Sequence, residues 1–366
     1  MLRETYARID LGKIAHNIRA LKQAAGTDVM AVIKADAYGH GMRRVAETAL
    51  REGVQWLAVA TPEEALELKE TAGERHILIL SPVLDRAIEP LVAKGISLCV
   101  CDAEQLAHIA QTAERLGKQA KLHIKTDTGM GRVGIRTREE MAALLALFRE
   151  RKSLILEGIF THFASADEAD KSFTYEQGRR FAEFCAMAEE AGFSPVRHAA
   201  NSAAIIDLPE LHFDLCRMGI SLYGYPPSDD VDASALGLQP AMELWSYVSY
   251  RKTIHAGDTV SYGRLFRAER DTEIATVPIG YADGYRRSLT GKAWAYFNGK
   301  KAMLAGRVCM DQIMFDVTGL DVKPGDRVLL MGRDMDADQM GRLVGTISYE
   351  ILTGISPRVP RVYVEY

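Results

Sequence analysis

From the N-terminus to about residue 220, short apolar runs alternate with helical patterns, and this alternation limits the possible folds more than any other feature. The runs are nearly continuous in apolar residues, which is typical of parallel strands buried on both faces. They are Asp28–Lys34, Trp56–Val59, Ile77–Leu80, Ser97–Val100, Ala120–Lys125, Leu154–His162, Pro195–Ala199 and Phe213–Arg217. About eight βα units predict an α/β fold, a (β/α)8 TIM-like barrel. A doubly wound open sheet could use as many strands.

Start signals delimit the helices between these runs. Residues 61–64 (Thr-Pro-Glu-Glu) place an N-cap before a proline at the first helical position, with acidic residues in the first turn. Asp102 is a predicted N-cap for a helix over Ala103–Leu116. Thr137 and Glu140 have the spacing of a capping box.

The pattern changes after about residue 235, where helical periodicity fades and strand-like runs take over. These runs are Glu243–Ile254, Thr272–Ile279, Lys301–Ala305, Gln312–Val317 and Asp326–Met331. We therefore predict a barrel over residues 1–235 and a mostly β C-terminal domain over residues 236–366. The strand-like run Thr5–Asp10 precedes the first barrel strand, so residues 1–10 could instead join the β domain.

Length and charge narrow the class of protein. At 366 residues, the chain is too long for one ordinary domain. Basic and acidic residues number 45 and 49, giving a net charge of −4, which argues against a nucleic acid or a membrane surface as partner. No apolar run is long enough to span a bilayer.

The cysteines and the N-terminal segment predict the cellular compartment of the protein. The five cysteines form no CxxC pair, which fits a reducing environment with neither a disulfide framework nor structural zinc. The N-terminal segment carries polar residues throughout and lacks the apolar stretch of a secretory signal. We expect a cytoplasmic protein without a metal site.

Polar side chains gather at the predicted strand ends, where barrel enzymes carry their chemistry. In chain order these ends hold Lys34, Thr61, Ser81, Asp102, Lys125, His162, His198 with Asn201, and Arg217. Lys34 ends a buried run, where desolvation lowers the pKa of an amine, and a neutral amine can form a Schiff base with a carbonyl. A strand-end lysine that points into solvent is an equally open interpretation.

Two further loops could hold a phosphate. Asn201-Ser202 follows the seventh strand and Gly219-Ile220 follows the eighth, where barrels often bind phosphate through backbone N–H groups. Tyr38 could reach this place from the first loop. Together with Lys34, these residues suggest pyridoxal phosphate, a phosphorylated carbonyl cofactor. In the alternative, Asn201 and Ser202 merely cap a helix.

Residues 129–134 (Gly-Met-Gly-Arg-Val-Gly) match the dinucleotide fingerprint GxGxxG, but the predicted helix starts later, at Thr137. We interpret this segment as a loop that aims Arg132 at a carboxylate. His162, His198 and Arg217 lack the companions of a zinc site, and they either contact the cofactor or form a buried polar network.

Residues 32–41, VIKADAYGHG, resemble the pyridoxal-phosphate attachment signature of the alanine racemase family. The resemblance extends over essentially the whole chain, in order and in spacing. It includes residues 125–132, 161–164, 198–202, 217–220, 260–263, 280–284 and 306–312. The family fold is a (β/α)8 barrel followed by a β domain.

The resemblance implies a racemase that interconverts L- and D-alanine and supplies D-alanine for peptidoglycan. It implies that Lys34 holds pyridoxal 5'-phosphate as an aldimine, and that Arg217 faces the pyridine nitrogen. The implied cofactor-binding residues are Lys34, Tyr38, His162, Asn201, Ser202, Arg217, Gly219, Ile220 and Tyr349. Lys34 would take the α-proton of D-alanine and Tyr262 that of L-alanine.

The resemblance also implies a head-to-tail homodimer, in which Tyr262 and Met310 reach the barrel of the other subunit. Arg132 and the backbone N–H of Met310 would bind the substrate carboxylate. In some relatives the lysine that matches Lys125 is carbamylated. The residues expected to support the site or to line its entrance are His198, Tyr281, Arg307 and Asp311.

Three alternatives remain open. The closest is a racemase for serine or for a broader set of amino acids, because one hydroxyl changes discrimination by only about 1–3 kcal/mol. A basic amino-acid decarboxylase would need a carboxylate at the pyridine nitrogen, and the cationic Arg217 argues against it. A non-catalytic pyridoxal-phosphate carrier would lack the C-terminal domain and Tyr262.

Overall fold

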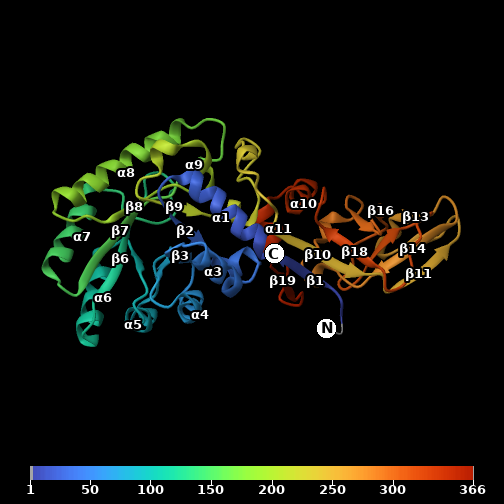
Figure 1. The fold of residues 1–366 in the computed structure, drawn as a ribbon, viewed down its shortest axis with the longest axis horizontal. Coiled ribbons are helices and arrows are strands. Elements are labelled where there is room, and N and C mark those ends of the chain that lie inside the picture. Colours follow the sequence, from blue (N-terminus) through green and yellow to red (C-terminus); the bar gives the residue numbers. More distant parts are fainter. Residues whose placement is uncertain (1–2, 366) are drawn as a thin grey trace. The chain divides into compact units, whose positions relative to one another are not determined.

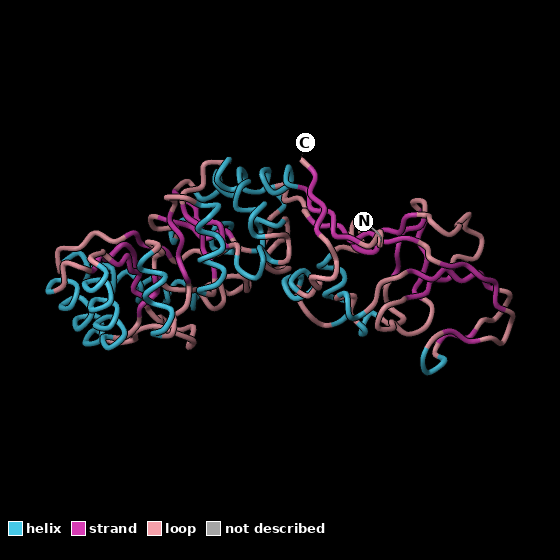
Figure 2. Tube along the Cα trace, turned by 90° about the horizontal axis from the view of Figure 1, so that it is seen from below, coloured by secondary structure: helices cyan, strands magenta, loops and turns pink. Residues whose placement is uncertain are grey.

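The computed structural model describes residues 3–365, so Met1, Leu2 and Tyr366 lie outside the described residues. The chain forms two compact units. The first, here called the barrel unit, comprises Ile14–Ala37 and Met42–Gln239. The second, here called the β unit, comprises the chain up to Lys13, the short segment Tyr38–Gly41 and the chain from Pro240 onward. Figure 2 shows helices around strands in the first unit and mainly strands and loops in the second.

The barrel unit contains eight parallel strands in two hydrogen-bonded groups, β4-β3-β2-β9 and β5-β6-β7-β8. A parallel bridge from Leu78 to Ser97 joins β4 to β5. The Arg217 N–H donates to the Ala200 carbonyl at 3.0 Å, which joins β9 to the end of β8. The strands are β2 (Asp28–Val32), β3 (Trp56–Val59), β4 (His76–Ile79), β5 (Leu98–Val100), β6 (Ala120–Lys125), β7 (Leu154–Phe160), β8 (Val196–His198) and β9 (Leu215–Met218). The ring is therefore closed, which confirms the barrel and excludes the open sheet.

Helices cover the outside of these strands (Figure 1). They are α1 (Leu11–Ala25), α3 (Met42–Arg51), α4 (Pro62–Ala72), α5 (Asp85–Ala93), α6 (Ala103–Leu116), α7 (Arg138–Glu150), α8 (Ser172–Glu190) and α9 (Ser202–Asp207). The predicted start signals are confirmed. Thr61 with Glu64, and Thr137 with Glu140, form capping boxes, and the Asp102 carboxylate accepts from the Gln105 N–H at 2.7 Å.

The first strand ends earlier than predicted. Strand β2 stops at Val32, and Lys34 begins the short helical turn α2 (Lys34–Tyr38). Ala35, Asp36 and Ala37 all have φ and ψ near +50°, so this turn is left-handed. A strand that stops two residues early leaves Lys34 on a turn at the barrel mouth rather than within the sheet.

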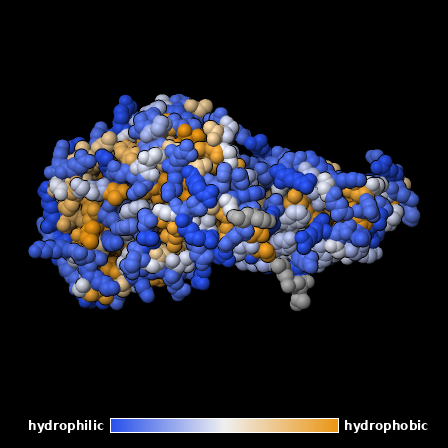
Figure 3. All heavy atoms as spheres, viewed as in Figure 1, coloured by the Kyte–Doolittle hydropathy of each residue, from blue (hydrophilic) through white to orange (hydrophobic). Residues whose placement is uncertain are grey.

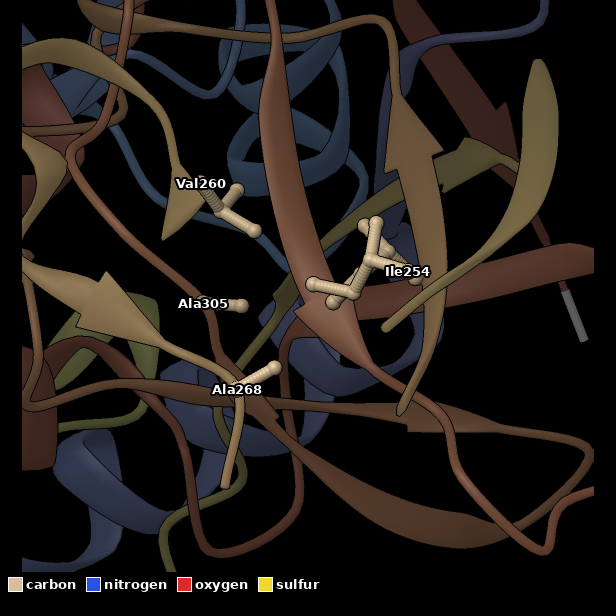
Figure 4. Packing of buried hydrophobic residues seen from close by; sticks show 5 residues of the cluster. Ile254, Val260, Ala268 and Ala305 are labelled. Carbon is tan, nitrogen blue, oxygen red and sulfur yellow. The ribbon is translucent and has the colours of Figure 1, made fainter. Parts of the chain in front are cut away.

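The β unit is built on a nine-stranded sheet in the order β11-β14-β17-β16-β15-β18-β10-β1-β19. Its strands are β1 (Tyr6–Asp10), β10 (Met242–Tyr247), β11 (Tyr250–Ile254), β14 (Thr272–Val277), β15 (Trp294–Phe297), β16 (Lys300–Leu304), β17 (Ile313–Asp316), β18 (Arg327–Met331) and β19 (Arg361–Val364). Strand β1 pairs with β10 and β19, so the first strand of the chain is part of this sheet. A hairpin of β12 (Thr259–Val260) and β13 (Phe266–Arg267) packs Val260 with Ile254, Ala268, Ile274 and Ala305 (Figure 4).

Some elements of the β unit were predicted wrongly or not at all. The predicted run Glu243–Ile254 is two strands, because the chain leaves the sheet after Tyr247 and re-enters it at Tyr250. Helices α10 (Ala337–Val344) and α11 (Ser348–Thr353) were not predicted either.

On the face drawn in Figure 3, hydrophilic residues predominate. Within residues 3–365, no helix is both long and apolar enough to cross a membrane.

Candidate active site

A cluster of cationic and imidazole side chains occupies the C-terminal ends of the barrel strands. Lys34 follows β2, Lys125 ends β6, His162 follows β7 and Arg217 lies in β9. Burial lowers the pKa of Lys34, and the positive charge of Arg132 lowers it further. Burial and the charge of Arg217 lower the pKa of Lys125 to about 8. The cluster therefore favours an anionic ligand and keeps its amines nucleophilic.

The loop that carries Lys34 is held from the neighbouring helix. The Ala35 N–H donates to Glu64 Oε1 at 2.6 Å, and the other oxygen of the same carboxylate accepts from the Ala60 N–H at 2.8 Å. On the other side of the turn, the Met42 N–H donates to Asp36 Oδ1 at 2.7 Å. The capping box of α4 thus also anchors the left-handed turn next to the lysine.

Arg217 is the centre of the polar interior. Its guanidinium donates to the backbone carbonyls of His198, Thr161 and Ala199 at 2.8–2.9 Å. It also lies 2.9 Å from His198 Nδ1 and 3.2 Å from His162 Nδ1. Burial lowers the pKa of Arg217 to about 10, so it stays protonated at neutral pH.

The two histidines beside Arg217 are neutral acceptors. Burial, and then the charge of Arg217, hold the pKa of both His162 and His198 well below the usual value. A guanidinium can only donate, so each imidazole accepts at Nδ1 and carries its proton on Nε2. His162 therefore offers its Nε2–H as a donor, and the predicted buried polar network exists around Arg217.

The loops after β8 and β9 bring hydroxyl and backbone donors together. Asn201 Oδ1 accepts from the Ala204 N–H at 3.1 Å, so this residue caps α9. Ser202 Oγ instead accepts from the Gly219 N–H at 2.9 Å, which leaves its hydroxyl hydrogen to donate elsewhere. Ser221 Oγ is buried and has no hydrogen-bond partner within the described residues. Sequence reasoning missed Ser221, although it directly follows the predicted pair Gly219-Ile220.

The glycine-rich segment after β6 is a loop shaped by Asp127. Asp127 Oδ1 accepts from the Gly129 and Gly131 N–H groups at 3.1 and 2.9 Å. A Cβ on Gly134, which has φ +126°, would lie 2.6 Å from the Asp127 nitrogen. Helix α7 begins only at Arg138, so no helix starts at the glycines and a dinucleotide motif is excluded. The loop presents Arg132, and Lys125 Nζ donates to the Thr126 carbonyl at 2.6 Å.

The remaining predicted residues belong to the β unit. Tyr38 is buried, which raises its pKa to about 12, and its ring centroid lies 6.0 Å from that of Tyr349. Tyr262 is 71% exposed and follows Ser261, a non-glycine residue with φ +69°. Ser261 Oγ donates to the Arg307 carbonyl at 2.8 Å.

The loops around Met310 hold the other β-unit residues. The side chain of Met310 is half exposed. The Tyr281 N–H donates to the Cys309 carbonyl at 3.0 Å, and Asp311 pairs with Arg358 at 2.8 Å. Tyr281 and Met310 thus lie on adjoining loops.

Sequence reasoning missed the groups behind His198. His198 Nε2 lies 2.9 Å from His123 Nδ1, and His123 Nε2 lies 3.2 Å from Glu157 Oε2. His123 and Glu157 are polar residues inside runs that were predicted to be buried on both faces. Such residues need partners, and that requirement was the available signal.

A closed barrel carries a lysine after its first strand, a buried arginine on the adjacent strand β9 and a loop rich in hydroxyl and backbone donors. This combination is typical of the class of pyridoxal-phosphate-dependent barrel enzymes. Comparison with known proteins narrows the class. The model of the alanine racemase N-terminal domain matches residues 9–227, and that of the C-terminal domain matches residues 241–363. The chain belongs to the alanine racemase family.

Similarity to individual proteins is nearly end to end. An alanine racemase of Clostridium tetani is 43% identical and aligns over 99% of this chain and 96% of the relative. One of Methanococcus maripaludis is 41% identical over 98% of each. The structure of an alanine racemase from Clostridium difficile 630 superimposes with a TM-score of 0.95 at 39% identity, covering 99% of this chain and 96% of that one.

These findings establish the activity. The protein is a pyridoxal-phosphate-dependent isomerase that interconverts L- and D-alanine, as the sequence predicted. The β domain that follows the barrel excludes the lone-barrel carrier.

Proposed function

We propose that Lys34 and Tyr262 are the two catalytic residues of this racemase, one on each face of the substrate α-carbon. The cofactor, when bound, supplies the electron-withdrawing ring that makes the α-proton removable. Lys34 Nζ takes that proton from D-alanine, and Tyr262 Oη takes it from L-alanine. The observation that carries the proposal is the lowered pKa of the Lys34 amine beside Arg132 and Arg217.

The donor set fits the cofactor. The Lys34 amine suits its carbonyl carbon, and the Ser202 hydroxyl suits its phosphate. Arg217 would face the pyridine nitrogen, and a guanidinium does not surrender its proton to that nitrogen. The cofactor is therefore a weaker electron sink, which suppresses transamination. The complete proposed set is Lys34, Tyr38, His162, Asn201, Ser202, Arg217, Gly219, Ile220 and Tyr349.

The substrate carboxylate would bind to Arg132 and to the Met310 backbone N–H. A planar guanidinium suits a carboxylate. The lowered pKa of Lys125 leaves part of its amine neutral near pH 8, which favours carbamylation, and a carbamate there would steady Arg132.

To act as a base, Tyr262 would need a hydrogen-bond donor that stabilises its phenolate form. The Nε2–H of His162 is a suitable donor, since His162 Nδ1 accepts from Arg217. In the proposed dimer, His162 would connect Arg217 to the second base.

We propose a head-to-tail homodimer in which residues 236–366 of one subunit contribute to the site on residues 1–235 of the other. Tyr262 and Met310 expose 71% and 52% of their surface, as expected of residues that a partner covers. His198, Tyr281, Arg307 and Asp311 would support the site or line its entrance. Tyr349 and Tyr281 would narrow that entrance, which favours alanine over serine.

The proposed role is the supply of D-alanine for peptidoglycan in the cytoplasm. The five cysteines of the chain are free, which agrees with a reducing compartment.

Exchange of the substrate α-proton with deuterium tests the two bases separately. In Tyr262→Ala, racemisation should be abolished, whereas the α-proton of D-alanine should still exchange with D2O through Lys34. Proton NMR follows each isomer. Tyr250→Ala, which alters another exposed tyrosine of the β unit, is the control and should racemise normally. Equally fast exchange of both isomers in Tyr262→Ala would show that Tyr262 is not the second base.

A further inference from the structure

A chain of hydrogen bonds runs from Arg217 through the barrel interior to a carboxylate. Arg217 Nη1 lies 2.9 Å from His198 Nδ1, and His198 Nε2 lies 2.9 Å from His123 Nδ1. His123 Nε2 lies 3.2 Å from Glu157 Oε2. Both imidazoles are fully buried, and the Glu157 side chain is 10% exposed. The four side chains come from β9, β8, β6 and β7 in turn.

The donor Arg217 at one end and the acceptor Glu157 at the other give this series of hydrogen bonds a single direction. Arg217 can only donate, so His198 Nδ1 accepts and the proton of neutral His198 is on Nε2. His198 Nε2–H then donates to His123 Nδ1, so His123 carries its own proton on Nε2. That proton faces Glu157, which as a carboxylate can only accept. Burial lowers the pKa of both imidazoles, which agrees with neutral rings.

The backbone is shaped to bring Glu157 to this place. Leu122 of β6 pairs with Leu156 of β7, but the next residue, His123, pairs with Gly158. Glu157 is therefore the extra residue of a β-bulge, a device that re-aims a side chain. A Cβ on Gly158 would lie 2.1 Å from His123 Nδ1, so only glycine leaves room for that ring.

Aromatic rings fix the planes of the imidazoles. The His198 ring stacks on Phe160 at 4.8 Å with an interplanar angle of 2°. The Trp56 ring meets the His123 ring edge-on at 5.7 Å. Neither imidazole can turn without breaking this packing, so its two nitrogen atoms keep their assigned partners.

Glu157 is also the acceptor for other groups. His76 Nδ1 lies 2.9 Å from Oε1, Lys121 Nζ lies 3.6 Å from the same oxygen, and the Ser97 hydroxyl donates to Oε2. Burial opposes ionisation, but the hydrogen bonds from His123, His76 and Ser97 outweigh it and hold the pKa of Glu157 well below its usual range. Within residues 3–365, no carboxylate forms an ion pair with Arg217. The series of hydrogen bonds through His198 and His123 therefore connects the Arg217 guanidinium to the negative charge of Glu157.

We propose that Glu157 is a positioning residue for the racemase, which orients Arg217 by fixing His123 and His198 as neutral Nε2–H tautomers. His198 Nδ1 then always accepts from the Arg217 guanidinium, which keeps that cation aimed at the cofactor ring. The expected effect on catalysis rests on the proposed contact between Arg217 and the pyridine nitrogen. The assignment of the two histidine tautomers rests only on hydrogen bonds within the protein.

Nitrogen-15 NMR of histidine-labelled holoenzyme tests the tautomers directly. In the wild type, His123 and His198 should each show one protonated nitrogen, Nε2, from pH 6 to 9, as assigned with His→Asn variants. In Glu157→Gln, the amide N–H can donate to His123 Nε2, which opposes the direction that Arg217 sets from the other end, so a measurable share of His123 and with it His198 should carry the proton on Nδ1. The kcat should fall by roughly tenfold to a hundredfold, the range observed when a residue that orients a metal-binding side chain is replaced. The KM for alanine should change less than about twofold.

Two comparisons decide the outcome. Glu114→Gln removes a carboxylate that also accepts from a serine and an arginine, but on the outside of the barrel, and should change neither the tautomers nor kcat. The proposal is overturned if wild-type His123 or His198 carries its proton on Nδ1 or is cationic. It is also overturned if Glu157→Gln leaves both tautomers as in the wild type, or mixes them without lowering kcat. A failure of Lys34 or Tyr262 as bases would leave the wild-type tautomers unchanged, so the two proposals fail independently.

Discussion

At the scale of single residues, the site depends on an amine whose pKa is lowered by its surroundings. Lys34 is half buried and faces two arginine charges, whose effect on its pKa is opposed by the charge of Glu64. Burial is the largest cause of its lowered pKa, and Arg132 is the next. The same arginine that would bind the substrate carboxylate thus also prepares the lysine for the cofactor.

Arg132→Met should raise the pKa of Lys34, because removal of a nearby positive charge favours the ammonium form. Only the neutral amine attaches the cofactor, so the rate of attachment to cofactor-free protein should reach its midpoint at higher pH than in the wild type. Absorbance follows the rate, and borohydride reduction with peptide mapping identifies Lys34. Arg136→Met, in the same loop but paired with Asp127, is the matched control. An unchanged pH profile in Arg132→Met would contradict the electrostatic assignment.

At the scale of elements, capping residues and strand runs were readable because their interactions are local. Strand Trp56–Val59 and helix Ala103–Leu116 have the predicted bounds. The left-handed turn after β2 was not readable, because alanine and aspartate rarely adopt positive φ. It depends instead on contacts outside the segment, from Glu64 to the Ala35 N–H and from Asp36 to the Met42 N–H.

Ala35→Gly should stabilise the protein by up to about 1 kcal/mol. A left-handed alanine costs roughly 1–2 kcal/mol that glycine avoids, and the greater freedom of glycine in the unfolded chain offsets part of the gain. Ala142→Gly, at an exposed position of the right-handed helix α7, should instead destabilise it by about 1 kcal/mol. Urea unfolding of the two variants gives the comparison. If both destabilise equally, Ala35 is not left-handed in solution.

At the scale of the whole molecule, the homodimer proposal implies active sites that two subunits share. Lys34 and Tyr262 belong to different units of the chain, and the homodimer proposal pairs them across two copies. A shared site has a distinctive genetic consequence, because two defective chains can restore one complete site between them.

A mixture of inactive Lys34→Ala chains and inactive Tyr262→Phe chains should regain activity after dissociation and reassociation. Half of randomly formed dimers are hybrids, and each hybrid has one intact site of two, so activity should approach about a quarter of the wild-type value. Differential tags on the two chains verify that hybrids form. Hybrids without activity would show that the catalytic pair lies within one chain.

The sequence by itself determined the succession of βα units, the following β domain and the position of Lys34 and Arg217 at or just after barrel strands, because periodicity, capping and order along the chain are local properties. Two features were decided only by the tertiary structure. One is the left-handed turn that carries Lys34. The other is the direction of hydrogen bonding from Arg217 to Glu157, which needs four strands, a bulge and a missing Cβ at Gly158 to meet in one place. No pattern along the chain encodes which nitrogen of His123 faces which neighbour, because that choice follows from atoms brought together only when the barrel closes.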